Sequence, residues 1–170
     1  MHPTAQLSPL RTSDFAALQA LAKAIWHEHY SSLLSQAQID YMLLGKYTPE
    51  DLAPFLESTD RWFDVLRVDA ELSGFVRCLR DGSTQFKLSE IYLSKACRGK
   101  GLGQLLLGRA QALAEASGCT SIILYVNRRN TQAVEAYERV GYVVKRECNF
   151  DIGEGYVMDD YLMQKSLSPQ

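Results

Sequence analysis

The sequence lacks several features that would assign it to a common functional class. Its formal net charge is −2 over 170 residues, so it has no excess of basic residues for binding nucleic acid. No apolar run approaches the roughly 20 residues of a membrane-spanning helix. The N-terminus also lacks the basic segment followed by an apolar stretch that a secretory signal would have. We therefore expect a cytoplasmic protein with no nucleic-acid and no membrane partner.

The cysteines lack the spacing of a zinc site. Cys78, Cys97, Cys119 and Cys148 are widely separated, with no C-x-x-C pair and no histidine cluster beside them, so we expect no metal. The hydrophobic content of 46% and charged content of 22% are ordinary for a globular chain. A chain of this length buries enough surface to fold as one domain, which we place over residues 1–170.

Hydrophobic periodicity and turn residues predict helices first, then strands, and then an alternation of the two. The predicted strands are 5–10, 62–68, 72–80, 86–93, 121–126, 142–150 and 156–163. The predicted helices begin near Ser13 or Asp14, Ser35, Thr48, Leu102 and Asn130. This order predicts an α/β fold of the α+β kind, with a mixed sheet flanked by helices.

The most informative stretch is Arg98-Gly99-Lys100-Gly101-Leu102-Gly103, between a predicted strand and a predicted helix. Such a turn exposes backbone N–H groups at the positive end of the helix dipole, which suits a phosphate or pyrophosphate. A Walker loop is excluded because Gly101, not Ser or Thr, follows Lys100. A dinucleotide fingerprint is excluded because Gln104 and Leu106 stand where its third glycine would be. A tight turn that binds no ligand remains the alternative.

The spacing of Arg98, Gly101 and Gly103 resembles the R/Q-x-x-G-x-G pyrophosphate loop of the GNAT acetyltransferases, which bind acetyl-coenzyme A. Asn130 and Tyr137 follow at separations similar to those in this family, and the order of elements is similar over nearly the whole chain. The resemblance implies the GNAT acyl-CoA N-acyltransferase fold. In that fold a mixed, mostly antiparallel sheet contains two parallel strands that splay apart.

The resemblance also implies which residues bind acetyl-CoA. The pantetheine arm is expected to lie between the splayed strands and to pair with the backbone of Ile91, Tyr92 and Leu93. The pyrophosphate is expected to be held by backbone N–H groups of residues 99–104, with added charge from two side chains; the set is Arg98, Gly99, Lys100, Gly101, Leu102, Gly103 and Gln104. Asn130 is predicted to be a helix cap, and its contact with the cofactor rests on the resemblance alone.

Two residues are candidates for catalysis. Acetyl transfer to an amine expels coenzyme A as a thiolate, to which a phenol that stays protonated at neutral pH can donate a proton. We expect Tyr137 to be this donor; the alternative is a buried aromatic on a core-facing helix. Glu90 is expected to accept the proton of the acceptor ammonium, directly or through water, although an exposed glutamate at a strand start is an equal alternative. Some family members carry a base five residues before the asparagine, where this sequence has Tyr125.

The segments 26–42 and 150–163 resemble the branch of the family that contains the PaiA-type polyamine acetyltransferases. Glu28 is expected to meet a cationic acceptor, and Trp26 and Tyr30 to cover its methylene groups or make cation–π contacts. Their spacing of four residues fits a core-facing helix side equally well. Three functions remain open: an N-acetyltransferase of small amines with polyamine-like acceptors favoured, an N-acetyltransferase of proteins or peptides, and a non-catalytic acyl-CoA sensor. A monomer and a homodimer are both compatible with the sequence.

Overall fold

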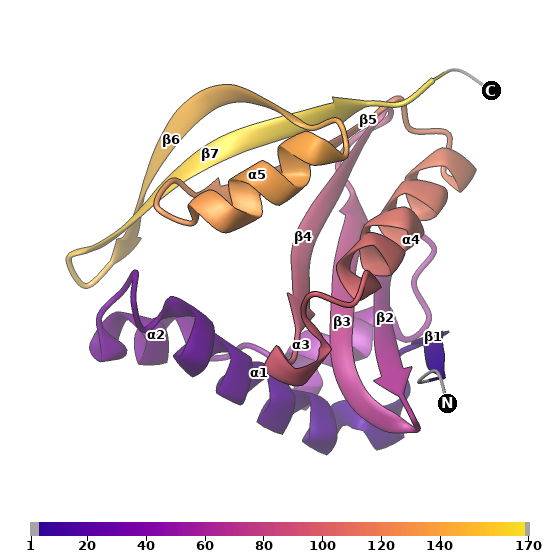
Figure 1. Cartoon of the computed structure of the whole chain (residues 1–170), viewed down its shortest axis with the longest axis horizontal. Helices are drawn as coiled ribbons and strands as arrows, with labels where there is room; N and C mark the ends of the chain where they lie inside the picture. Colours follow the sequence, from indigo (N-terminus) through magenta and orange to yellow (C-terminus); the bar gives the residue numbers. More distant parts are fainter. Residues whose placement is uncertain (1–3, 169–170) are drawn as a thin grey trace. The chain divides into compact units, whose positions relative to one another are not determined.

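The computed structural model describes residues 4–168 and contains a mixed sheet of seven strands flanked by helices (Figure 1). The strands are β1 (Ala5–Pro9), β2 (Arg61–Val68), β3 (Glu71–Arg80), β4 (Gln85–Leu93), β5 (Ser121–Asn127), β6 (Val143–Gly153) and β7 (Tyr156–Ser166). The helices are α1 (Phe15–Tyr30), α2 (Gln36–Leu43), α3 (Pro49–Leu52), α4 (Leu102–Ala116) and α5 (Thr131–Arg139), with 3₁₀ turns η1 (Thr12–Asp14), η2 (Ala53–Phe55) and η3 (Lys95–Cys97). The strand order is β1-β2-β3-β4-β5-β7-β6, which confirms the predicted fold class.

Two predicted helix starts are confirmed at the level of the cap itself. The hydroxyl of Ser35 accepts a hydrogen bond from the backbone N–H of Gln38 at 3.1 Å, at the start of α2. The hydroxyl of Thr48 accepts one from the backbone N–H of Asp51 at 3.3 Å, with proline at the first helical position of α3. These caps form from neighbouring residues, which is why the sequence predicts them.

The first long helix begins after Asp14, as predicted, but the predicted side-chain cap does not form. Asp14 stands at the cap position of α1, but its side chain makes no cap hydrogen bond. One carboxylate oxygen accepts the backbone N–H of Arg11 at 2.9 Å, and the other pairs with Arg67 of β2. The buried carboxylate therefore ties the entry of α1 to the sheet instead of capping the helix.

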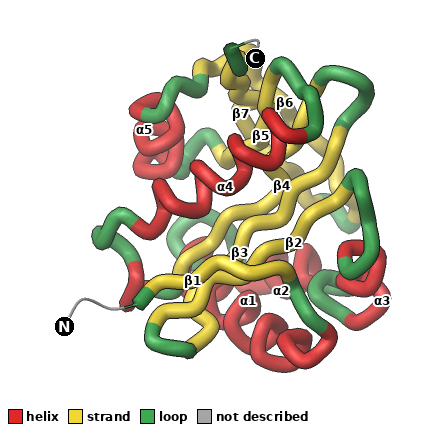
Figure 2. The backbone as a smooth tube through the Cα atoms, turned by 90° about the vertical axis from the view of Figure 1, so that its right-hand side faces the viewer, coloured by secondary structure: helices red, strands yellow, loops and turns green. Residues whose placement is uncertain are grey.

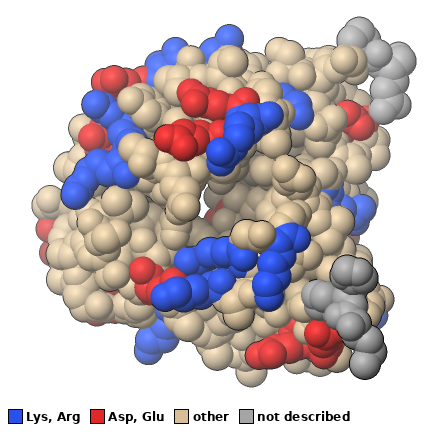
Figure 3. All heavy atoms as spheres, viewed as in Figure 1, with Lys and Arg blue, Asp and Glu red and all other residues tan. Residues whose placement is uncertain are grey.

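The chain comprises two compact units. The first contains the described residues up to Leu79 together with Glu90–Ala110, and the second contains Arg80–Ser89 and the described residues from Gln111 onward. Strand β4 contributes residues to both. On the face drawn in Figure 3 charges of both signs are interspersed, in keeping with a net charge of −2.

In the first unit the two faces of β2 and β3 pack against different helices (Figure 2). Phe63 lies opposite Arg77, and Val65 lies opposite Phe75, so these side chains share one face. That face packs on α1, α2 and the α3 region, in a core of Leu10, Leu18, Ala22, Trp26, Ile39, Tyr47, Leu52, Phe55, Phe63, Val65 and Phe75. The other face meets α4, where Arg109 pairs with the buried Asp64 of β2.

Gly74 lies where β3 and β4 approach each other closely. A Cβ atom at this position would lie 2.7 Å from the carbonyl oxygen of Tyr92 and 2.7 Å from Cδ2 of Leu93. Cδ2 is the end of a flexible side chain, whereas the carbonyl belongs to the backbone of β4. Lack of space therefore requires glycine in the interior of this strand.

In the second unit β5 is the central strand. It runs parallel to β4, paired over Gln85–Lys87, and antiparallel to β7, paired over its full length. Its residues are buried apart from the partly exposed Tyr125, as its apolar sequence predicts. Strand β6 pairs with the far side of β7. No helix within residues 4–168 is long and apolar enough to cross a membrane.

Candidate functional site

The glycine loop between β4 and α4 has the backbone conformation that a phosphate cradle requires. Gly99 has φ +74° and Gly101 has φ +77°, a region that side chains other than glycine rarely adopt. Helix α4 begins directly afterwards at Leu102, so its first N–H groups, which lack intrahelical partners, lie next to the loop. Gln104 was predicted to offer its backbone N–H to the pyrophosphate, but this N–H already donates to the carbonyl oxygen of Gly101 at 3.1 Å.

Arg98 connects this loop to α1. Its Nη1 donates to Oε1 of Glu28 at 2.9 Å, and its Nε donates to the carbonyl oxygen of Leu93 at 3.2 Å. The side chains are 37% and 38% exposed, so solvent screens the ion pair and its net stabilisation is small. The structure thus brings together residues that the sequence assigns separately to the acetyl donor and to the acceptor.

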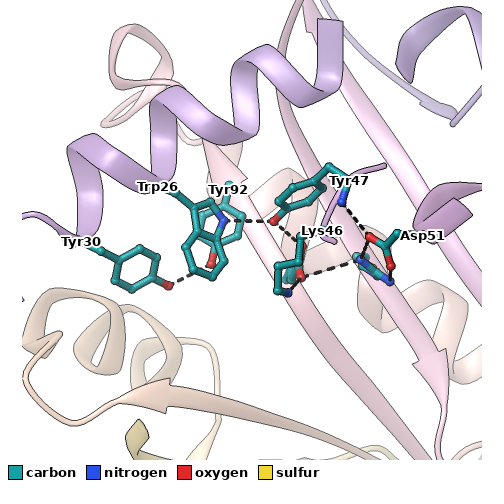
Figure 4. Close-up of polar contacts among 8 residues, drawn as sticks. Trp26, Tyr30, Lys46, Tyr47, Asp51 and Tyr92 are labelled. Carbon is teal, nitrogen blue, oxygen red and sulfur yellow. Dashed lines mark hydrogen bonds and ion pairs between the residues drawn. The ribbon is translucent and has the colours of Figure 1, made fainter. Parts of the chain in front are cut away.

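The aromatic residues predicted for the acceptor site form one cluster (Figure 4). Trp26 is 3% exposed, belongs to the core, and donates from Nε1 to the hydroxyl of Tyr47 at 3.0 Å. The ring of Tyr30 lies 4.9 Å from that of Trp26, and its hydroxyl lies 2.9 Å from that of Tyr92. Burial raises the pKa of Tyr92 well above its usual value, so this hydroxyl stays protonated.

Glu90 is the centre of a buried charged network that the sequence did not reveal. Its side chain is 7% exposed; Oε1 accepts from Nζ of Lys46 at 2.6 Å and Oε2 accepts from the hydroxyl of Tyr47 at 2.6 Å. Nη1 of Arg77 lies 3.9 Å from Oε1, and Arg77 also donates both terminal nitrogens to Asp51, at 2.7 and 2.9 Å. Both oxygens of Glu90 are therefore already engaged.

Tyr47 holds a backbone conformation that costs energy. Its φ of +60° is in the left-handed region, unusual for an aromatic residue. Burial, followed by the charge of Glu90, raises the pKa of Tyr47, so its hydroxyl donates to the carboxylate. No local pattern in the sequence marks this residue, because its partners come from distant segments.

A cavity of about 300 Å³ adjoins the network in the first unit. It is lined by Gln19, Lys23, His27, Asp40, Leu43, Leu44, Lys46 and Tyr47. The volume is at the lower end of the range of small-molecule sites. The lining carries charges of both signs, with Nε2 of His27 3.4 Å from Oδ1 of Asp40. Among the residues that the structure describes, no group of His, Cys, Asp and Glu is arranged to hold a metal ion.

The second unit contains Asn130 and Tyr137. Oδ1 of Asn130 accepts the backbone N–H of Ala133 at 3.3 Å, which confirms the predicted cap of α5. Tyr137 is half-buried in α5, with its ring edge-to-face against Tyr142 at 5.7 Å. The remaining assigned residues belong to the first unit: Glu90, Ile91, Tyr92, Leu93, the glycine loop, Trp26, Glu28 and Tyr30.

Asp160 of β7 is a buried acid that sequence analysis missed. Two adjacent acids, Asp159 and Asp160, interrupt the otherwise apolar run of residues 156–163, and acids are uncommon in strands. Asp160 is 6% exposed. That interruption is the signal that identifies this position.

The carboxyl of Asp160 should lower stability at neutral pH. Burial, and then the charge of Asp159, raises the pKa of this carboxyl from 3.8 to about 6. The contribution of the protonated carboxyl to the free energy of unfolding is therefore fully present below about pH 4, and it is lost as the pH rises through 6. We expect Asp160→Asn to increase the free energy of unfolding at pH 8 by up to about 3 kcal/mol, and to leave it unchanged near pH 4. Denaturant titrations of the wild type and the variant at both pH values measure this; a loss of stability at pH 8 contradicts it.

Comparison with known proteins decides the family. A sequence model of the acetyltransferase (GNAT) family matches residues 17–142. The chain belongs to the GNAT family. It is therefore an acetyl-CoA-dependent N-acetyltransferase, with acetyl-CoA as its acetyl donor. The left-handed glycines before α4 fit the phosphates of that donor.

Individual GNAT relatives are distant. The chain is 25% identical over 144 residues to the spermidine N(1)-acetyltransferase of Thermoplasma acidophilum, covering 82% of this chain and 89% of that one. It is 46% identical over 61 residues to the mycothiol acetyltransferase of Corynebacterium glutamicum, but these cover 34% of this chain and 21% of that one. The structure of the PaiA N-acetyltransferase of Thermoplasma acidophilum in complex with coenzyme A has a TM-score of 0.82 at 23% identity, covering 96% of this chain and 99% of that chain.

Proposed function

We propose that this protein moves the acetyl group of acetyl-CoA to a primary amine of a small molecule, with a polyamine-like acceptor favoured. The observation that carries the proposal is the 25% identity to a spermidine N(1)-acetyltransferase, which extends over most of both chains. The proposal includes one domain over residues 1–170, acting in the cytoplasm as a monomer or homodimer. An N-acetyltransferase of proteins or peptides is the second candidate.

The donor is proposed to bind along β4 and the glycine loop. The backbone of Ile91–Leu93 pairs with the amide-bearing pantetheine arm, and the N–H groups of residues 99–103 hold the pyrophosphate. Arg98 contributes charge once it leaves Glu28, and Asn130 contributes a contact from the start of α5. The left-handed backbone at Gly101 supports this assignment, since a residue without a side chain lets a phosphate approach the N–H groups of the loop closely.

Replacing glycine with alanine should have different effects at Gly101, in the loop, and at Gly108, in the helix that follows it. Gly101→Ala should raise the KM for acetyl-CoA by about 10-fold, because alanine at a left-handed φ costs roughly 1–2 kcal/mol. Gly108→Ala, in the interior of the helix α4 that follows the loop, should leave the KM unchanged and increase stability by about 1 kcal/mol. Steady-state kinetics and thermal unfolding of both variants measure this. Equal KM values in the two variants would show that the loop does not hold the donor.

In the chemical step, the neutral amine attacks the thioester carbonyl and the sulfur of coenzyme A leaves with the electron pair. Tyr137 is proposed to donate its phenolic proton to this sulfur. Glu90 is the proposed base for the acceptor ammonium. Since its oxygens accept hydrogen bonds from Lys46 and Tyr47, one of these bonds opens when the proton arrives.

The acceptor is proposed to meet Glu28 and the aromatic cluster. Glu28 offers a carboxylate for an ammonium group, in competition with Arg98. Tyr30 offers a partly exposed ring for methylene groups, and the buried Trp26 supports that ring from the core. A flexible acceptor with several charges gains from such a combination of acid and aromatic surface.

Thiol release from acetyl-CoA tests the function. The purified protein is supplied with polyamines, amino acids, aminoglycosides and peptides, and free coenzyme A is measured against a water background. Release that is fastest with polyamines supports the proposal, and release that is fastest with peptides supports the second candidate. No release with any amine would leave a non-catalytic acyl-CoA sensor as the function.

A further inference from the structure

Asp160 is a buried carboxylate without a counterion. Its Oδ1 is sealed from solvent and has no hydrogen-bond partner among residues 4–168, and Asp160 takes part in none of the ion pairs of that range. A buried, unpaired carboxylate is costly, and proteins normally neutralise it with a cation or a hydrogen-bond donor. A site of this kind is suited to a cation that comes from outside the chain.

The pairing of β5, β7 and β6 places Asp160 among aromatic side chains. Asp160 lies opposite Asn127 of β5 and opposite Cys148 of β6, so the three side chains share a face. On that face Tyr125 lies opposite Leu162, two residues beyond Asp160 along β7, and Phe150 lies opposite Met158, two residues before it.

The two rings therefore approach each other across the position of Asp160. Their centroids are 5.4 Å apart, in an edge-to-face arrangement. A ring face of Tyr125 also accepts a cation, since Nζ of Lys87 lies 5.3 Å from its centroid. Acid and aromatic groups thus combine at the carboxyl end of β5, a strand that runs parallel to β4, and ligands commonly bind at such strand ends.

We propose that Asp160 binds one ammonium group of a polyamine acceptor, while the rings of Tyr125 and Phe150 pack against the adjoining methylene groups. The exposed ring of Phe150 turns aside to admit the ammonium, which supplies the missing counterion and donates hydrogen bonds to the carboxylate. The rings supply apolar and cation–π contacts to an alkylamine. This assignment rests on the proposed function and adds to it a residue that recognises the substrate.

The protonation of Asp160 makes this recognition depend on pH. Its pKa of about 6 is set by burial and by Asp159. The other ionisable groups on its face are Arg146 and Cys148 on β6, Tyr156 on β7, Tyr125 on β5 and Lys87 on β4. Below pH 6 the carboxyl takes up a proton and loses the charge that attracts the ammonium. The KM for the amine should therefore rise as the pH falls through 6.

The test compares Asp160→Asn with Asp159→Asn. The control removes a neighbouring acid whose Oδ1 lies 3.4 Å from Arg128. With spermidine as the probe, Asp160→Asn should raise the amine KM at pH 8 at least about 10-fold, leave the KM for acetyl-CoA within twofold, and abolish the change near pH 6. Asp159→Asn should keep the wild-type amine KM, and Asp160→Glu should recover part of the loss.

The outcomes separate this inference from the proposed function. If the wild type acetylates amines and Asp160→Asn has the wild-type amine KM, the function holds and the inference is wrong. If no amine accelerates thiol release by the wild type, the proposed function fails, and calorimetric titration with spermidine then decides the inference. Weaker binding of spermidine to Asp160→Asn than to the wild type supports the inference. Equal binding to both proteins, or binding to neither, overturns it. If Asp160→Asn does not fold, a wild-type amine KM that stays constant from pH 5 to pH 8 overturns it.

Discussion

Replacing Tyr137 with phenylalanine should lower kcat by about 100-fold or more, with the KM for acetyl-CoA nearly unchanged. The substitution removes the phenolic proton that is proposed to protonate the leaving thiolate. It keeps the ring, and with it the edge-to-face contact with Tyr142 at 5.7 Å, so the packing of α5 is preserved. The loss should therefore fall on the chemical step.

Tyr142→Phe is the matched control, because it makes the same chemical change on the partner ring. It should keep kcat within about threefold. Thiol release at saturating acetyl-CoA and amine gives kcat for both variants, and circular dichroism verifies their folding. An unchanged kcat in Tyr137→Phe would remove Tyr137 from catalysis and leave it as a packing residue.

Glu90→Gln should also lower kcat by about 100-fold or more, because glutamine has no lone pair basic enough to take the proton of the acceptor. Glutamine preserves the shape of the side chain, and its carbonyl oxygen can still accept a hydrogen bond from the hydroxyl of Tyr47. The charge opposite Lys46 is lost, and Arg77 keeps Asp51 as its partner. The variant thus tests the proton acceptor with limited disturbance of the network.

The measurement combines kinetics with stability, since removing one partner of a buried ion pair lowers stability as well. Rates are normalised to the folded fraction at each temperature. A lower melting temperature together with an unchanged normalised kcat would assign Glu90 a structural role only, and another group would then accept the proton.

The sequence predicted what depends on neighbouring residues. The caps at Ser35, Thr48 and Asn130 agree with the structure because each is a hydrogen bond across three residues or fewer. Strand β5 agrees because an apolar run is itself the property of a strand covered on both faces. The class of the fold followed from the order of these local elements.

The features that could not be predicted from the sequence depend on contacts between residues that are far apart along the chain. Asp14 was expected to cap a helix, but Arg67, 53 residues away, pairs with its carboxylate. The partners of Glu90 come from positions 44 and 43 residues earlier, and the φ of +60° at Tyr47 has no sequence pattern. The acid at Asp160 was visible in the sequence, but its burial depends on the pairing of β5, β6 and β7.

Gly74 illustrates how a position can influence a ligand that it never touches. Any side chain there presses on the carbonyl of Tyr92, in the stretch of β4 proposed to pair with the pantetheine arm. In a mutational scan, variants at position 74 should lose affinity for acetyl-CoA, as variants of the residues that contact it do. The positions at which substitutions weaken acetyl-CoA binding will therefore include residues of β3, which lies beside the binding strand. Distance from the ligand alone will underestimate how many positions affect its affinity.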